Sequence, residues 1–331
     1  MLPIQSDPTP AAWPNGWNPP SSLDTKLFKN FASYLHHRAA LEILPSLNIS
    51  KLDLANERQS MQRYADRAQR MQFLTADDEQ IDGVIVWALP ADGKEENYTK
   101  QNWILYLNGN GETYEDNLAF LNWYAKETGC NLISFNYRGV GESSGYPNCF
   151  KDLVIDADAV FQHLERHGVA SNRILIHARS LGGAVGVALR ALHEDGPICN
   201  ERSLSSWGAV EVCLSGKISG SLFNLYLQAM GWNIQPLEDW EKIQGYKWVI
   251  VSPTDEVIDF KKASFYAGLR RAYGLSEKEL EEQIPVIKLP SFYSELNGNR
   301  PEGHNIPLNS KVINDVWEEH KRMIQKAFKG E

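Results

Sequence analysis

The sequence has few of the features typical of disulfide-stabilised, metal-binding or membrane-spanning proteins. Its 331 residues include only four cysteines, Cys130, Cys149, Cys199 and Cys213, and no two of them have the close spacing of a zinc site. Four cysteines in a chain of this length are not a disulfide framework, so we expect reduced and partly buried thiols. No apolar run is long enough to span a bilayer, and no transmembrane segment is expected.

Positive charge is also scarce. The 33 Lys and Arg residues are outnumbered by 42 Asp and Glu residues, which gives a net charge of −9. This balance repels a phosphate backbone, so no nucleic-acid partner is expected. The stretch 1–20 lacks the apolar core of a classical secretory signal. A cytoplasmic location is therefore expected, and the alternative is export as an effector by a specialised secretion system.

Hydrophobic residues make up 43% of the chain, enough for a sizeable core, and their distribution divides the sequence into three parts. Residues 1–22 are rich in proline and should be extended. Residues 23–72 should form N-terminal helices, over 23–44 and 52–72, packed on or beside the core. Residues 73–331 form the main domain.

Short apolar runs alternate with amphipathic stretches throughout the main domain. The expected strands are 81–87, 103–107, 132–135, 173–176, 197–199, 247–251 and 286–289. The expected helices are 115–127, 150–167, 181–194, 205–230, 259–271 and 310–328. Such alternation predicts an α/β fold, in which a mostly parallel central sheet of about eight strands is flanked by helices.

A serine follows one of these strands in a tight turn. The sequence after His177 is Ala178-Arg-Ser180-Leu-Gly182-Gly, and a helix is expected to follow directly. A strand, a turn with serine between small residues and a helix together form the nucleophile elbow of hydrolases. The usual pattern is G-x-S-x-G, and Ala178 replaces its first glycine. The alternative interpretation is a serine that caps the helix.

The strand at 103–107 ends in the turn Asn-Gly-Asn110-Gly. A glycine-rich turn at this place can supply a backbone N–H to an oxyanion hole, and the residue after the nucleophile, Leu181, would supply another. We therefore place Asn110 and Leu181 in the predicted oxyanion hole. A simple turn is the alternative.

An acidic residue and a histidine follow the last two strands. Asp255 comes after the strand at 247–251, where Glu256 and Asp259 compete with it, and His304 follows the strand at 286–289 after a loop. Such a histidine can act as a general base, and such a carboxylate can orient it. Taken singly, a helix-start carboxylate and an exposed loop histidine are the alternatives. The order Ser180, Asp255, His304 is nevertheless the order found in α/β hydrolases.

The stretch 135–143, Phe-Asn-Tyr-Arg-Gly-Val-Gly-Glu-Ser, resembles the loop after the fourth strand of α/β hydrolases, and the segments just described resemble them too. The resemblance covers roughly residues 75–325. A narrower resemblance is to a poorly characterised α/β-hydrolase group from intracellular bacterial pathogens. It rests on 136–143, on Cys-Asn-Glu-Arg-Ser at 199–203, on Trp232-Asn233 and on Lys-Lys-Ala-Ser at 261–264. Such enzymes commonly have Gly-His where this chain has Ala178-Arg179, which bears on substrate preference.

The resemblance implies a serine hydrolase with a Ser180–His304–Asp255 triad, an acyl-enzyme intermediate, no metal and no organic cofactor. The expected substrate is a small-molecule or lipid acyl ester or thioester. The region 205–246 would form a helical cap. A catalytically silent hydrolase fold that acts as a binding or regulatory protein is the alternative.

Four further residues are candidates for substrate binding. Arg138 and Arg179 could bind an anionic group of the substrate, and ion pairs with nearby carboxylates are the alternative. Phe223 and Tyr226 lie in the apolar and aromatic part of the expected cap. They could line an acyl pocket, and plain packing of the cap is the alternative.

Overall fold

The computed structural model describes residues 4–6, 40, 44, 47, 49, 54–89, 97–210, 217–294 and 300–330. The chain divides by its internal contacts into two compact units: Met1–Ala170 with Tyr226–Asn233, and Ser171–Leu225 with Ile234–Glu331. The helix expected over 23–44 lies almost entirely outside the described residues, as does Cys213. The other three cysteines are buried and free, as expected. No helix within the described ranges combines the length and the apolar composition needed to cross a membrane.

The first unit is built on a mixed sheet. Its strands are β1 (Ile4–Ser6), β2 (Ala68–Leu74), β3 (Gln80–Val86), β4 (Trp103–Leu107) and β5 (Asn131–Phe135), in the order β1-β2-β3-β5-β4. β3 runs antiparallel to β2 and β5, whereas β4 and β5 are parallel. Every residue of β4 and β5 is buried, as the mostly apolar sequence of these strands predicts.

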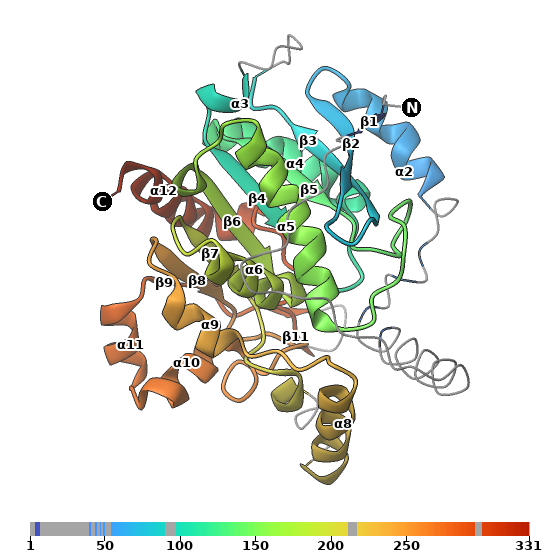
Figure 1. Ribbon diagram of the computed structural model, residues 1–331. Helices are drawn as coiled ribbons and strands as arrows, with labels where there is room; N and C mark the ends of the chain where they lie inside the picture. The colour runs from blue at the N-terminus through green and yellow to red at the C-terminus, as the bar shows by residue number, and fades with distance from the viewer. Residues whose placement is uncertain are drawn as a thin grey trace, which may run out of the picture. The chain divides into compact units, whose positions relative to one another are not determined.

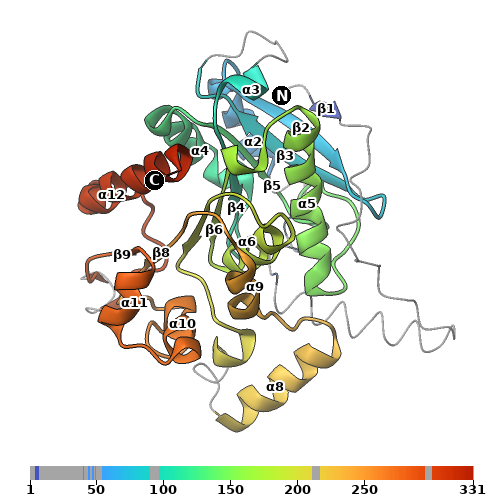
Figure 2. The same ribbon diagram turned by 60° about the vertical axis from the view of Figure 1, so that its left-hand side comes forward.

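Helices cover both faces of this sheet. α4 (Tyr114–Thr128) and α5 (Phe150–Arg166) lie on opposite faces, as Figures 1 and 2 show. The Thr113 side chain caps α4 by accepting a hydrogen bond from the N–H of Asp116, and Gly129 ends it with a φ of 69°. The shorter elements are α2 (Ala55–Ser60), the 3₁₀ turn η2 (Met61–Tyr64) and α3 (Asn97–Lys100).

The helix expected over 52–72 is wrong in its second half. The helical segments α2 and η2 end at Tyr64, and β2 begins at Ala68. β2 pairs along its whole length with β3, from Ala68 opposite Val86 to Leu74 opposite Gln80. The apolar residues here fit both a helical and a strand spacing, and pairing with a neighbouring strand decides between them because it satisfies the backbone hydrogen bonds of both segments.

The second unit contains four parallel strands in sequential order. They are β6 (Ile174–Arg179), β7 (Ile198–Glu201), β8 (Lys247–Val251) and β9 (Val286–Lys288). α6 (Leu181–Leu192) and α12 (Asn314–Lys329) lie on opposite faces of these strands (Figures 1 and 2). The other elements of the unit are α9 (Pro236–Lys242), α10 (Phe265–Tyr273), α11 (Glu277–Gln283), η3 (Ser171–Arg173), η4 (Lys311–Ile313), β10 (Tyr293–Ser294) and β11 (Arg300–Pro301). α8 (Lys217–Ala229) contributes to both units.

The carboxyl ends of β6, β7 and β8 lie at one edge of this parallel group. Ser180 follows β6, Arg202 follows β7, and Asp255 comes four residues after the end of β8 at Val251. Sites in open parallel sheets are built from the residues that follow such strand ends. The expected α/β arrangement is therefore confirmed, and it brings the candidate residues to one edge.

A buried ionic cluster ties α2 to the core of the first unit. The Arg58 guanidinium forms ion pairs with Asp82 on β3 at 3.0 Å and with Glu115 on α4 at 2.7 Å. It also pairs with Glu142, which in turn contacts Arg70 at 2.9 Å. The side chains of Asp82 and Glu115 are fully buried, so each carboxylate depends on its arginine partners.

We expect the substitution Arg58→Met to destabilise the protein by about 3–5 kcal/mol, because it leaves the buried Glu115 carboxylate without its arginine partner and removes one of the two arginines that pair with the buried Asp82. Urea unfolding followed by circular dichroism measures this change in the free energy of unfolding. The exposed Arg63 provides the matched control, and Arg63→Met should change it by less than about 0.5 kcal/mol. Equal effects of the two substitutions would contradict the assigned role of Arg58.

Candidate active site

Ser180 occupies a strained turn between β6 and α6. Its backbone has φ 52° and ψ −120°, a conformation that residues other than glycine rarely adopt. The Ser180 N–H donates to the carbonyl of Glu201 at 2.9 Å, and the N–H of Gly183 donates to the Ser180 carbonyl at 2.9 Å. A side chain at Gly183 would place its Cβ 2.3 Å from the Cβ of Ser203. The glycine at position 183 is thus required by the close approach of α6 to the segment that follows β7.

The side chains of Ser180, His304 and Asp255 form a continuous hydrogen-bonded row. His304 Nε2 lies 3.0 Å from Ser180 Oγ, and His304 Nδ1 lies 2.8 Å from Asp255 Oδ2. The other oxygen of Asp255 accepts hydrogen bonds from the N–H groups of Val257 at 3.0 Å and Ile258 at 2.7 Å. The carboxylate is therefore held in place from both sides. All three residues belong to the second unit.

The two competing carboxylates have other partners. Glu256 Oε2 accepts hydrogen bonds from the backbone N–H groups of Gly303 at 2.6 Å and His304 at 2.9 Å. Burial acts to raise the pKa of the Glu256 carboxyl, but these hydrogen bonds outweigh it and the pKa lies below its usual value. Asp259 Oδ1 accepts from the N–H groups of Lys261 and Lys262 at 3.0 and 2.9 Å. Of the three, only Asp255 contacts the imidazole ring among the hydrogen bonds of the described residues.

Two arginines hold the backbone of the loop that carries His304, and the sequence predicted neither contact. Arg179 Nη2 donates to the His304 carbonyl at 2.9 Å, and Arg202 Nη1 donates to the carbonyls of Gly303 at 2.9 Å and Ile306 at 2.7 Å. Arg202 also pairs with Glu201. Glu201 at the end of the buried strand β7, followed directly by Arg202, is the sequence signal that could have drawn attention to Arg202.

The predicted oxyanion-hole residues belong to different units. Asn110 lies in an exposed turn after β4, in the first unit. That turn is closed by a hydrogen bond from the Gly109 N–H to Glu112 Oε2 at 2.8 Å, and Gly111 has a φ of 79°. Leu181 is the first residue of α6, in the second unit. Their shared role stays a prediction.

The structure shows for Arg138 the ion pairs with carboxylates that were its alternative, whereas the described hydrogen bonds of Arg179 are to other groups. Arg138 is buried, and its guanidinium donates to Asp156 Oδ1 at 2.8 Å and to Asp77 Oδ2 at 2.7 Å. Arg179 is also buried, and it contacts the His304 carbonyl and, at 3.2 Å, Asn305 Oδ1. The described hydrogen bonds of both guanidiniums are thus to protein groups, and substrate binding by either stays a prediction.

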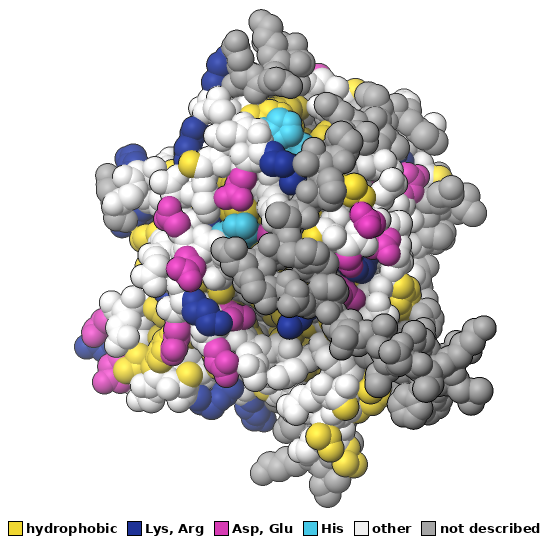
Figure 3. Space-filling view, viewed as in Figure 1, with side chains coloured by type: hydrophobic (Ala, Val, Ile, Leu, Met, Phe, Trp, Pro, Cys, Tyr) yellow, Lys and Arg dark blue, Asp and Glu magenta, His cyan; other side chains and the backbone are white. Residues whose placement is uncertain are grey.

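The expected cap residues lie on α8. The Phe223 side chain falls outside the described residues, and Tyr226 is half-buried. Two neighbouring leucines on this helix are far more open: Leu222 is 66% and Leu225 63% exposed. Hydrophobic side chains accordingly gather over α8 at the lower edge of Figure 3. An acyl pocket at Phe223 and Tyr226 stays a prediction.

One group of side chains has the composition of a metal site. The potential ligand atoms of His177 on β6, Cys199 on β7 and His320 on α12 lie within 4.8 Å of one another, and all three residues are buried. Hydrogen bonds already engage both histidines, however. His177 Nε2 lies 2.7 Å from Glu201 Oε2, and the Trp248 indole N–H donates to His320 Nδ1 at 3.3 Å. A metal on His320 Nε2 would require a proton on Nδ1, which that indole N–H opposes. The arrangement fits a hydrogen-bonded core.

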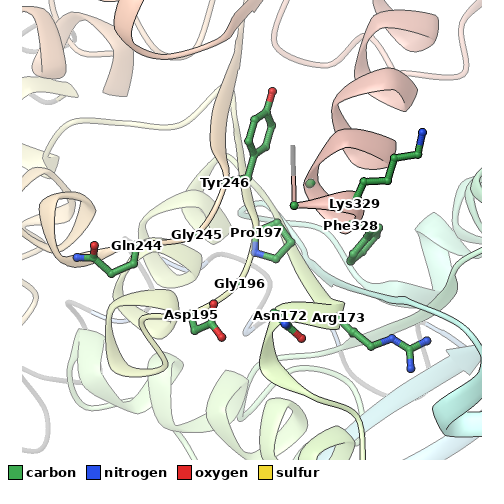
Figure 4. A pocket seen from close by; sticks show the side chains of 12 residues that line it. Asn172, Arg173, Asp195, Gly196, Pro197, Gln244, Gly245, Tyr246, Phe328 and Lys329 are labelled. Atoms are coloured by element: carbon green, nitrogen blue, oxygen red, sulfur yellow. The ribbon is translucent and has the colours of Figure 1, made fainter.

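A hollow of about 540 Å³ lies at the opposite ends of the strands from the serine. It is lined by residues that precede β6, β7 and β8, among them Arg173, Asp195 and Tyr246, and by Phe328 at the end of α12. Figure 4 shows these side chains around Gly196 and Pro197. Neither Ser180 nor His304 lines it, so the hydrogen-bonded row defines the candidate site independently of this hollow.

The glycine before His304 is required by the close approach of two loops. A Cβ at position 303 would lie 2.0 Å from Ser252 Oγ and 2.8 Å from the Thr254 carbonyl. We expect Gly303→Ala to displace His304 and to lower kcat of any hydrolysis by about 10–100-fold, because small misplacements of catalytic groups have effects of this size. Steady-state kinetics on a p-nitrophenyl ester measures the change.

The control for this substitution is Gly274→Ala. Gly274 caps α10 with a φ of 66° and has open space around its Cα. Alanine there is strained by about 1 kcal/mol but contacts no part of the site, so kcat should stay within about twofold of the wild-type value. A Gly303→Ala protein with unchanged kcat would contradict the proposed packing constraint.

The fold and the relatives of this chain place it in the class of α/β hydrolase domain proteins. The chain belongs to the family described as Chlamydia CHLPS protein (DUF818), which matches residues 51–255. The expected resemblance to α/β hydrolases is thereby confirmed, and the family fits the narrower likeness to proteins of bacterial pathogens.

Curated relatives point to the same class. The chain is 34% identical over 226 residues to the α/β hydrolase domain-containing protein WAV2 of Arabidopsis thaliana, covering 65% of this chain and 64% of the relative. It is 27% identical over 203 residues to α/β hydrolase domain-containing protein 17C of Mus musculus, covering 61% and 58%. The chain thus spans less than two thirds of the length of these curated relatives.

Solved structures share the fold. An α/β hydrolase from Vibrio vulnificus superposes with a TM-score of 0.58 at 17% identity, covering 95% of this chain and 98% of that structure. An esterase from Pyrococcus furiosus superposes with a TM-score of 0.56 at 14% identity, covering 81% and 94%. At these identities, the likeness concerns the fold alone.

Proposed function

We propose that this α/β hydrolase is a serine hydrolase that cleaves carboxylic esters or thioesters, with Ser180 as nucleophile, His304 as general base and Asp255 as the residue that orients it. The observation that carries the proposal is the hydrogen-bonded row in which His304 lies 3.0 Å from Ser180 Oγ and 2.8 Å from Asp255 Oδ2. A nucleophile, a base and a carboxylate in this order are the minimum machinery of acyl transfer.

The reaction proceeds in two halves. His304 Nε2 takes the proton of the Ser180 hydroxyl as Oγ bonds to the acyl carbon, and the carbonyl oxygen becomes an oxyanion. When this tetrahedral intermediate collapses, the bond to the leaving group breaks, and His304 returns the proton to the leaving alcohol or thiol. In the second half, His304 takes a proton from water, the hydroxide adds to the acyl-enzyme, and the acid is released with Ser180 protonated again.

The surroundings of the row support these roles. The Asp255 carboxylate accepts a hydrogen bond from the Nδ1–H of His304, which leaves Nε2 as the acceptor facing Ser180, and it stabilises the imidazolium that forms. The strained turn holds Oγ at the end of β6, at the start of α6. In the proposal, the N–H group of Leu181, directly after the nucleophile, stabilises the oxyanion.

An acyl substrate with apolar character fits the exposed leucines of α8. Leu222 and Leu225 present an apolar surface on the segment expected to form the cap. Ester cleavage is also the activity named for the solved esterase of Pyrococcus furiosus, which shares this fold. We therefore place small-molecule or lipid acyl esters ahead of charged substrates.

Hydrolysis profiling tests the proposal. The wild-type protein is assayed against p-nitrophenyl esters of increasing chain length, acyl-CoAs and phospholipids. Turnover of at least one of these classes, well above the rate with the Ser180→Ala protein, is expected. If no class is turned over faster than by that variant, a catalytically silent fold that acts as a binding or regulatory protein becomes the better account.

A further inference from the structure

The loop that carries His304 lacks regular secondary structure, so its backbone groups need partners from elsewhere. Charged side chains supply them. Glu256 accepts from the N–H groups of Gly303 and His304, at 2.6 and 2.9 Å. Arg179 donates to the His304 carbonyl at 2.9 Å. Arg202 donates to the carbonyls on either side, those of Gly303 and Ile306, at 2.9 and 2.7 Å.

Arg202 stands out among these partners because it bridges two carbonyls of the loop. Its side chain is 1% exposed, and its backbone has a φ of 47°, a conformation that costs energy in an arginine. The Arg202 N–H donates to the carbonyl of Ile250 on β8 at 2.7 Å, which anchors the residue to the strand next to β7. Burial of the charge and the strained backbone both cost free energy, which the contacts of Arg202 must offset. Two of these contacts are with carbonyls of the loop that carries His304, called the histidine loop below (residues 302–310).

Glu201 connects this arginine to the nucleophile. Its carboxylate pairs with Arg202 through Oε1 and lies 2.7 Å from His177 Nε2 through Oε2. Burial opposes the charge on Glu201, but Arg202 and His177 outweigh it and hold the pKa of this carboxyl well below its usual value. The Glu201 carbonyl meanwhile accepts the hydrogen bond from the Ser180 N–H at 2.9 Å. One dipeptide therefore contacts both the elbow and the histidine loop.

We infer that Glu201 and Arg202 form a positioning pair that fixes His304 against Ser180, with Arg202 holding the backbone of residues 303–306. The inference rests on the proposed function insofar as it concerns catalysis. The pair touches neither substrate nor the reacting atoms in this account. It acts by keeping His304 Nε2 within hydrogen-bond distance of Ser180 Oγ, a distance to which rates are steeply sensitive.

Arg190 offers a matched control in the same unit. It is also a fully buried arginine that donates to backbone carbonyls, those of Asp195 at 2.6 Å and Ile174 at 2.7 Å. Those carbonyls lie before β7 and at the start of β6, at the strand ends opposite the serine. Arg202→Met and Arg190→Met thus both remove a buried guanidinium, but only the first releases the histidine loop.

The test combines kinetics with a readout that does not need activity. We expect Arg202→Met to lower kcat for a p-nitrophenyl ester about 10–100-fold with KM changed less than about threefold, and Arg202→Lys to restore part of kcat. Arg190→Met should leave kcat within about twofold of wild type, although urea unfolding shows a comparable loss of stability. Equal losses of kcat in the two methionine variants, or none in Arg202→Met, would overturn the inference.

Amide hydrogen exchange separates this inference from the proposed function. Mass spectrometry of the peptide that contains residues 303–306 should show faster exchange in Arg202→Met than in wild type or Arg190→Met, whether or not the protein hydrolyses esters. Unchanged protection of this peptide in Arg202→Met would overturn the positioning role. A wild-type protein without esterase activity but with the expected exchange would overturn only the proposed function.

Discussion

Replacement of Ser180 by alanine is expected to lower kcat for ester hydrolysis by at least about ten-thousand-fold. The substitution removes the only oxygen that His304 Nε2 contacts among the described hydrogen bonds of the row, at 3.0 Å, and without it no acyl-enzyme can form. The fold should persist, because alanine adds no atoms and leaves intact the backbone hydrogen bonds of the turn to Glu201 and Gly183. Initial rates on the best p-nitrophenyl ester give the measurement.

Ser291 provides the control for this substitution. It lies exposed in the loop after β9, in the same unit, and Ser291→Ala should leave kcat within about twofold of wild type. Hydrolysis by the Ser180→Ala protein at a tenth of the wild-type rate or more would mean that another group performs the attack.

Replacement of Asp255 by asparagine is expected to lower kcat by roughly ten-thousand-fold at neutral pH. Asparagine can keep the hydrogen bonds that Asp255 Oδ1 accepts from Val257 and Ile258, so the local turn should survive. The amide that replaces Oδ2, however, either donates to His304 Nδ1 or carries no charge to stabilise the imidazolium. Either effect leaves Ser180 without an effective base.

Substitutions of the neighbouring acidic residues show whether the loss of kcat is specific to the carboxylate of Asp255. Asp259→Asn should leave kcat nearly unchanged, because Asp259 accepts only the N–H groups of its own turn in the described hydrogen bonds. Glu256→Gln should cost about tenfold or less, because the glutamine carbonyl can still accept from Gly303 and His304. A larger loss in Glu256→Gln than in Asp255→Asn would reassign the orienting carboxylate.

Buried parallel strands were the most predictable part of the fold. The strands expected at 103–107 and 247–251 have the same bounds in the structure as β4 and β8, because a short, continuously apolar run has little choice except a covered strand. The helix predicted for residues 68–72 was wrong because their apolar spacing fits a helix as well as a strand. The pairing with β3, which makes this segment a strand, involves residues that are not adjacent in the sequence. The helix α11 was not predicted because its residues are mostly charged and show little apolar periodicity. Its capping box, Ser276 with Glu279, was nevertheless present in the sequence as a helix-start signal.

The candidate site divides in the same way. Ser180, Asp255 and His304 could be named from the sequence because each follows an apolar strand and their order is informative. The role of Arg202 could not, because its partners lie about a hundred positions away, at Gly303 and Ile306. Arg179 was predicted to lie near the candidate site and to bind an anionic group of the substrate. It does lie there, but its described partners are the backbone of His304 and the side chain of Asn305. Strand ends are encoded locally, whereas loop–loop contacts depend on the completed fold.

The identity of the nucleophile is tested most directly by a fluorophosphonate, which forms a stable bond with an activated serine. After the wild-type protein is treated with the probe at neutral pH, intact-mass and peptide mass spectrometry show how many groups are attached and where. We predict a single adduct on Ser180, absent from the Ser180→Ala protein and strongly slowed in Asp255→Asn. A wild-type protein that resists the probe as fully as Ser180→Ala does, or an adduct on another serine, would contradict the assignment of Ser180.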